Sequence, residues 1–424
     1  MPQGLADRVD SLVDADTSRL TQLFKDIHRH PELGFAETRT AGIVATTLTD
    51  LGFSVTTGIG GTGVAATLSN GPGPAVMYRA DMDALPVEEA TGLDYASTVR
   101  LTRDDGTQTP VAHVCGHDAH VTWMLGMARV LAQTTDDWSG TAVLVGQPAE
   151  ELIAGAQAMV DDGLYKVVPK PDFLIGMHTA PAPVGLVAAC GGPMMSGSDQ
   201  IDIVFRGVGG HGSMPQLAKD PVLMAALAVV QFQTIISRII APQETAVLTV
   251  GSVQAGSTYN VIPDQAVLKA NLRWFNPHVR EQLIAGIKAV SEGTARTYGM
   301  PEDQLPVVTV GGGSTPLVND EQLADRVARA LQPIMGSDKV VTTLPPATAS
   351  EDCQLLKGPH HDVPLGYLFV GVADPQVCAE AYAAGKLFPY SPHSPDYRVD
   401  LAAIPLGAKV ASYAMLDLLG TVHP

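Results

Sequence analysis

Side chains that commonly bind metal ions occur in several separate segments of the chain. The densest segment, residues 113–120, reads His-Val-Cys-Gly-His-Asp-Ala-His. The thiol, imidazole and carboxylate groups that suit zinc or a similar first-row ion belong to Cys115, His117, His178, His393 and Glu151. Each segment alone is a weak signal, because Cys-x-His pairs are common by chance and adjacent glutamates usually form a solvated helix start. Together, the segments predict a metal site.

The number of candidate ligands indicates two ions. Five protein ligands exceed the three that a single catalytic zinc takes together with a water, whereas they fit two ions about 3.5–4 Å apart that share a bridging ligand. Such ions would activate a water, and a base must take its proton. Glu150 is the candidate base, because its neighbour Glu151 can bind metal while Glu150 points elsewhere. Asp83 could orient a ligand histidine, and Asp81 is an equal candidate for that role.

The elements that carry these side chains alternate between strands and helices. Helical periodicity predicts helices within 5–28, at 40–51, at about 121–131 and near 321–331, and apolar runs predict strands at 64–68, 75–78, 142–145, 173–177 and 365–370. This alternation indicates an α/β domain with a mostly parallel, buried sheet. Ligands bind beyond the carboxyl ends of such strands, where the sequence places Asp83, Glu150 and His178.

Residues 197–310 follow another pattern. Strands predicted at 201–205, 246–253, 266–275 and 306–310, with helices at 221–240 and 279–298, give the βαββαβ order of a ferredoxin-like α+β domain. We therefore expect a discontinuous catalytic domain, 1–196 and 311–424, with a compact insertion at 197–310.

A glycine-rich segment within this insertion offers an alternative function. Residues 207–212 match the dinucleotide-binding fingerprint and follow a predicted strand. However, no helix begins directly after them, and the next predicted strand carries no acidic residue to bind a ribose. We therefore reject a dehydrogenase and expect a tight loop that presents His211.

Composition narrows the class of protein further. The 424 residues include 26 Lys+Arg and 44 Asp+Glu, a net charge of −18, with 46% hydrophobic and 17% charged residues. These proportions are typical of a globular enzyme, and the negative charge argues against binding of nucleic acid or an anionic membrane. The sequence shows no secretory signal, no uninterrupted apolar run of about 18 residues, and four scattered cysteines. A cytoplasmic protein with reduced thiols is expected.

Taken together, the motifs resemble the amidohydrolase branch of the aminoacylase and carboxypeptidase-G metallopeptidase family, which includes hippurate hydrolases, N-acyl-amino-acid amidohydrolases and auxin-conjugate hydrolases. The match runs in order along nearly the whole chain, and residues 113–120 are its most specific part. The other matching segments are 28–33, 79–86, 147–151, 178, 210–213, 260–264, 350–352 and 393–395.

The resemblance implies a hydrolase domain with two divalent ions per subunit (zinc, manganese, cobalt or nickel) and a ferredoxin-like lid that dimerises. It implies that the ions are held by Cys115, His117, Glu151, His178 and His393 and that Glu150 is the general base. It further implies that His211 stabilises the oxyanion and that Asn260 and Arg273 hold the substrate. A homodimer or homotetramer is expected.

The function that we expect is hydrolysis of the amide bond of N-acyl-amino acids. The nearest rival is a dipeptidase or carboxypeptidase on the same scaffold. A binding protein that has lost turnover is the alternative from another class, but the candidate ligands, base and lid histidine are all present in the sequence.

Overall fold

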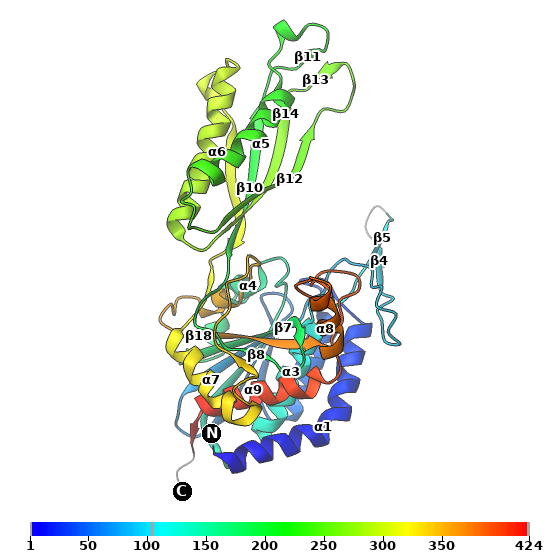
Figure 1. Cartoon of the computed structure of the whole chain (residues 1–424), viewed down its shortest axis with the longest axis vertical. Coiled ribbons are helices and arrows are strands. Elements are labelled where there is room, and N and C mark those ends of the chain that lie inside the picture. Colours follow the sequence, from blue (N-terminus) through cyan, green and yellow to red (C-terminus); the bar gives the residue numbers. More distant parts are fainter. Residues whose placement is uncertain (1, 103–105, 422–424) are drawn as a thin grey trace. The chain divides into compact units, whose positions relative to one another are not determined.

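The computed structural model describes residues 2–102 and 106–421 (Figure 1). The chain forms two compact units. The first consists of Met1–Met194, Val318–Pro345 and Asp352–Pro424, and the second of Met195–Leu317 and Pro346–Glu351. The insertion expected from the sequence, 197–310, lies within the second unit. The return of Pro346–Glu351 to that unit has no counterpart in the sequence-based division.

A mixed, mostly parallel sheet forms the centre of the first unit. Its strands are β1 (Ser54–Ile59), β2 (Gly63–Asn70), β3 (Ala75–Asp81), β6 (Trp138–Gln147), β7 (Phe173–Pro183), β8 (Val187–Ala188), β17 (Val340–Val341) and β18 (Leu365–Ala373). Their order is β1-β2-β6-β3-β7-β18-β8-β17. The central pairs β6–β3, β3–β7 and β7–β18 are parallel, whereas β1–β2 and β2–β6 are antiparallel. The predicted α/β class is confirmed.

Helices cover this sheet. They are α1 (Gln3–Arg29), α2 (Thr38–Asp50), α3 (His117–Gln133), α4 (Gly155–Asp161), α7 (Glu321–Met335), α8 (Pro375–Ala383) and α9 (Ala403–Leu418). Helices α1, α3 and α9 pack against one another, and α3 and α9 also contact β3 and β7 (Figure 1). Almost every side chain of α3 is buried, because the helix lies between the sheet and these neighbours. The start of α3 at His117 puts the candidate metal-binding motif at the helix N-terminus.

Several short strands complete the described part of the chain. They are β4 (Arg100–Thr102), β5 (Gln108–Pro110), β9 (Gly192–Met195), β16 (Leu317–Asn319) and β19 (Gly420–Thr421). β4 pairs with β5, and β19 pairs with β6, both antiparallel.

The second unit is a ferredoxin-like α+β domain. Its main elements are β10 (Gly197–Arg206), α5 (Pro221–Arg238), β12 (Ala246–Ala255), β14 (Gln265–Trp274), α6 (Pro277–Thr297) and β15 (Val307–Ser314), and a small ribbon is formed by β11 (Gly210–His211) and β13 (Val261–Ile262). The main sheet is antiparallel with the order β12-β14-β10-β15. Both helices contribute to the core, for example through Phe232 and Leu283. The predicted βαββαβ order is confirmed.

The loop between β10 and α5 contains the glycine-rich segment. The short strand β11 lies within this segment, and a 3-10 turn at Pro215–Leu217 comes between its last glycine, Gly212, and the start of α5 at Pro221. A dinucleotide site needs the last glycine to open directly into a helix, so that backbone N–H groups reach the pyrophosphate. The local structure therefore agrees with the rejection of a dehydrogenase.

Helix α5 is the candidate membrane span found in the part of the chain that the structure describes, by its length and composition alone. Met224, Phe232 and Ile235 of this helix are buried in the core of the second unit. Core helices of folded domains pass the same test, so α5 is only weak support for a membrane span.

Candidate metal centre

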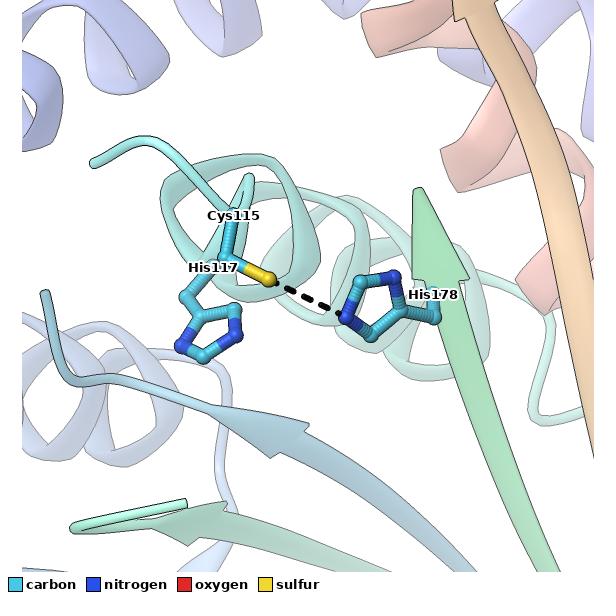
Figure 2. Close-up of side chains that lie close together, drawn as sticks. All are labelled: Cys115, His117 and His178. Carbon is cyan, nitrogen blue, oxygen red and sulfur yellow. Dashed lines mark hydrogen bonds between the residues drawn. The ribbon is translucent and has the colours of Figure 1, made fainter. Parts of the chain in front are cut away.

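The first unit brings all five candidate ligands together with Glu150. Cys115 and His117 lie at the N-terminus of α3, His178 lies in β7, and Figure 2 shows these three side chains facing one another. Glu151 follows β6, and His393 lies in the loop between α8 and α9. The groups whose ligand atoms all lie within 4.8 Å of one another include Cys115–His117–His178, Cys115–Glu151–His393 and His117–Glu150–Glu151.

The distances between these side chains match those of donors around a shared ion. Sγ of Cys115 lies 3.5 Å from Nε2 of His178 (Figure 2), and Nε2 of His393 lies 3.2 Å from Oε1 of Glu151. Nε2 of His117 lies 3.8 Å from Glu150 and 3.9 Å from Glu151. Two donors bound to one zinc ion in tetrahedral geometry are about 3.3–3.8 Å apart. The separations therefore allow shared coordination.

Unpaired polar atoms indicate which groups face an ion. Within the described residues, Nε2 of His117 is buried and has no hydrogen-bond partner. Such atoms are costly unless another group, an ion or water satisfies them. Burial, and then the nearby carboxylates of Glu151 and Glu150, raise the pKa of the Cys115 thiol well above its usual range. A divalent cation would offset this crowding of negative charge and bind the thiolate, so the residues present fit metal binding.

Asp83 connects the candidate ligand His117 to the glutamate pair. Its Oδ1 lies 3.2 Å from Nδ1 of His117, which leaves Nε2 of that ring for metal, and its Oδ2 accepts the backbone N–H of Glu151 at 2.9 Å. Burial lowers the pKa of His117, but the Asp81 and Asp83 carboxylates outweigh it and raise the pKa to about 10. Oδ1 of Asp81 lies instead 2.5 Å from Nδ1 of His120. Of the two aspartates considered for orienting a ligand histidine, Asp83 is therefore the one that contacts Nδ1 of His117.

The turn that carries Glu150 has an unusual backbone. Ala149 and Ile153 have positive φ angles of 49° and 52°, in the left-handed region. The N–H of Ile153 donates to the carbonyl of Glu150 at 2.7 Å. A Cβ on Gly155 would lie 1.5 Å from the carbonyl oxygen of Pro148, so only glycine fits there. Left-handed non-glycine residues cost about 1–3 kcal/mol each and persist where their surroundings hold them, often at functional sites.

Sequence reasoning missed the residues that support the ligands from behind. Thr179 donates its hydroxyl to the carbonyl of Cys115 at 2.7 Å and its N–H to Nε2 of His120 at 2.9 Å. Its carbonyl oxygen lies 2.7 Å from Nδ1 of His178, and Tyr397 donates its hydroxyl to Oγ1 of Thr179 at 2.7 Å. The three-residue spacing of His117 and His120 could have shown that both lie on one helix face. Nothing in the sequence pattern indicates Thr179 or Tyr397.

The second unit holds His211 and Asn260 close together. His211 pairs with Val261 across the β11–β13 ribbon, and the carbonyl of Asn260 accepts the N–H of Gly212 at 2.8 Å. Both residues line an open cavity of about 560 Å³, together with Gly209, Gly210 and residues 261–264. Nδ1 of His211 accepts the N–H of Ser213 at 3.1 Å, so in the neutral ring Nε2 carries the proton.

Arg273 lies elsewhere in the second unit. It belongs to β14, is half-buried, and donates from Nη1 to the hydroxyl of Ser350. It is not among the residues that line the cavity of His211 and Asn260. Of the three residues of the second unit that were expected to contact the substrate, His211 and Asn260 therefore lie together, and Arg273 lies apart from them.

Known proteins resemble the chain along most of its length. Residues 77–417 match the family model described as Peptidase family M20/M25/M40. An N-acetyl-L-cysteine deacetylase of Bacillus subtilis is 35% identical, over 79% of this chain and 76% of the relative. A hippurate hydrolase of Campylobacter jejuni is also 35% identical, over 78% of this chain and 84% of the relative. A solved dinuclear metal-binding peptidase of the M20 family from Bacillus subtilis superposes with a TM-score of 0.75 at 26% identity, over 96% of this chain and 100% of that one.

Proposed function

Because the chain belongs to the peptidase family M20/M25/M40, in its amidohydrolase branch, we propose that it cleaves the amide bond of N-acyl-amino acids with Glu150 as general base. The resemblance drawn from the sequence motifs is confirmed, and the chain is a metallo-amidohydrolase of the N-acyl-amino-acid type. The observation that carries the mechanism is the meeting of five donor side chains beside Glu150 in the first unit.

We assign a pair of divalent ions to five ligands, Cys115, His117, Glu151, His178 and His393. When bound, such ions acidify a water and polarise the carbonyl under attack. The chain's part is to hold the ligand atoms in place: Asp83 fixes the ring of His117, and Thr179 fixes the ring of His178 and the backbone of Cys115. This support keeps Nε2 of both histidines directed into the centre.

Glu150 is assigned the proton transfers. Its carboxylate takes the proton of the attacking water and delivers it to the amide nitrogen, which leaves as the free amine. Glu151 lies close to both Cys115 and His393, whereas Glu150 groups with neither of these two candidate ligands. This difference supports Glu151 as a ligand and Glu150 as the base.

His211 is assigned a hydrogen bond to the oxyanion that forms when water adds to the amide carbonyl. The contact from Ser213 supports this role, because it fixes the ring with Nε2 as donor. Asn260 and Arg273 are assigned to the substrate's carboxylate or carbonyl. His211→Ala should lower kcat more than it raises KM, whereas Arg273→Ala should mainly raise KM.

A substrate panel tests the proposed function. N-acetyl, N-benzoyl and N-indoleacetyl derivatives of several amino acids would be compared with unblocked dipeptides, with a chelator as control. We expect amine release from the N-acyl-amino acids and loss of this activity with the chelator. Turnover of the unblocked dipeptides alone would instead identify a dipeptidase.

A further inference from the structure

A buried carboxylate outside the metal centre holds the turn that carries the general base. Glu37 precedes α2 and is fully buried. Its Oε1 accepts the N–H of Ala149, the residue directly before Glu150, at 2.8 Å, and its Oε2 accepts the hydroxyl of Thr62. We infer that Glu37 is a positioning residue that fixes the direction of Glu150 through the backbone of Ala149, an inference that rests on the proposed role of Glu150.

The backbone around Glu37 approaches the turn very closely. A Cβ on Gly34 would lie 3.1 Å from Cα of Ala149 and 3.1 Å from a methyl group of Leu152, so the turn packs directly on this segment. Ala149 itself has a φ of 49°, in the left-handed region that strains an alanine. The hydrogen bond that the N–H of Ala149 donates to Glu37 holds it there.

Two carboxylates from other segments bracket Glu150. Glu37 accepts the N–H of the preceding residue, and Asp83 accepts the N–H of the following residue, Glu151. Asp83 also contacts His117, so its loss would disturb the metal ligands. The Glu37 side chain accepts hydrogen bonds from Ala149 and Thr62, and neither is a candidate ligand. Loss of Glu37 should therefore disturb the base while the ions remain bound.

The burial of Glu37 has a cost that a purely apolar side chain would avoid. Burial raises its pKa, although the hydrogen bonds from Thr62 and Ala149 oppose the shift. Without the carboxylate, the N–H of Ala149 would lose its acceptor, and Ala149 could relax to a negative φ. A shift of about 1 Å in a catalytic group lowers turnover by about 100-fold.

Substitutions of Glu37 test this inference. Glu37→Leu keeps a similar volume but removes the acceptor, whereas Glu37→Gln keeps a carbonyl oxygen that can accept the N–H of Ala149. We expect Glu37→Leu to lower kcat by about 100-fold with KM and bound metal unchanged, and Glu37→Gln to stay close to wild type. If Glu37→Leu does not fold, Glu37→Asp replaces it, because the shorter carboxylate stays buried but withdraws from Ala149.

Glu32 provides a matched control on the same segment. Its carboxylate accepts the N–H groups of Arg39 and Thr40, both at 2.8 Å, and so caps α2 without contacting the turn. Glu32→Leu should lower Tm and leave kcat unchanged. Equal losses of kcat in both leucine variants, a wild-type kcat in Glu37→Leu, or loss of metal from it would each overturn the inference.

Hydrogen exchange gives a readout that does not depend on turnover. Amide exchange in the peptide 148–155 should be faster in Glu37→Leu than in wild type and unchanged in Glu32→Leu, because only the first loses the acceptor of Ala149. Unchanged exchange in Glu37→Leu would overturn the inference. A wild-type protein that cleaves no N-acyl-amino acid would instead remove the proposed function.

Discussion

Glu150 and Glu151 are adjacent in the sequence but have different neighbours. Oε1 of Glu151 lies 3.2 Å from Nε2 of His393, and its ligand atom also groups with Cys115. Glu150 approaches His117 at 3.8 Å and follows the strained Ala149. The two carboxylates therefore have different neighbours, so that one can bind metal and the other can exchange protons.

Exchange of each glutamate for glutamine should separate these roles. Glu150→Gln is expected to keep both ions while kcat falls by about 10²–10⁴-fold, because the proton acceptor is lost without loss of a ligand. Glu151→Gln is expected to lose bound metal as well as turnover. Elemental analysis alongside kinetics checks both variants. If Glu150→Gln loses metal and Glu151→Gln retains it, the two assignments must be exchanged.

At the scale of elements, α3 carries the candidate ligand His117 and is fixed by close packing on α9. Gly407 of α9 lies against the ring of Trp123 in α3, where an added Cβ would be 2.1 Å from the ring. Trp123 donates its Nε1–H to the carbonyl of Ala403 at 3.0 Å. A glycine is therefore required at position 407 for α3 and α9 to pack this closely.

Two glycine-to-alanine substitutions should have opposite effects on stability. Gly407→Ala is expected to lower the free energy of unfolding by about 1–3 kcal/mol or more, because the Trp123 ring must move. Gly42→Ala, on the exposed face of α2 with open space around it, is expected to raise it by about 0.5–1 kcal/mol. Denaturant unfolding measures both. A change of the same sign in the two variants would contradict this description of the helix contact.

A buried ionic cluster connects α1 to the start of α3. Nδ1 of His28 lies 2.6 Å from Asp118, and its Nε2 lies 3.2 Å from Glu89. Burial lowers the pKa of His28, but the two carboxylates outweigh it and raise the pKa from 6.5 to about 9. His113 and then His28 lower the pKa of Asp118, and His28 lowers the pKa of Glu89, in both cases against the effect of burial.

This cluster predicts a fall in stability at alkaline pH. Because the pKa of His28 is higher in the folded state, its contribution of about 3 kcal/mol is complete below the unfolded pKa and is lost as pH rises through about 9. The pKa values of Asp118 and Glu89 are instead lower in the folded state, so the stability that these carboxylates contribute is lost as the pH falls. Urea unfolding near pH 6 and near pH 10 measures the difference, which should be smaller in His28→Gln. An equal pH dependence in the two proteins would rule out this role for His28.

Elements with clear periodicity were predictable from the sequence, and elements without it were missed. β3, β7 and α5 follow apolar runs of the expected length, whereas α9 has buried residues on all sides and contains Pro405 and Gly407, so it lacks an amphipathic pattern. The exposed edge strand β1 also lacks an apolar run. The candidate ligands were identifiable by residue type, but Glu37 and Thr179 act through contacts between distant segments, which no local pattern reveals.

At the scale of the whole molecule, the order of elements along the chain predicted an α/β domain with a ferredoxin-like unit inserted between its halves. Packing, and not periodicity, sets the limits of the units, because Pro346–Glu351 returns to the second unit after a helix of the first. Dimerisation and a cytoplasmic location stay predictions from the sequence.

Metal dependence of the complete protein tests the proposed function most directly. The protein would be freed of metal by a chelator and then titrated with zinc, manganese, cobalt or nickel while hydrolysis of an N-acyl-amino acid is followed. We predict no turnover without metal and a rise that reaches its plateau at about two equivalents of ion per chain. Full turnover by the metal-free protein, or no binding of any of these ions, would contradict the assignment of a metal pair to Cys115, His117, Glu151, His178 and His393.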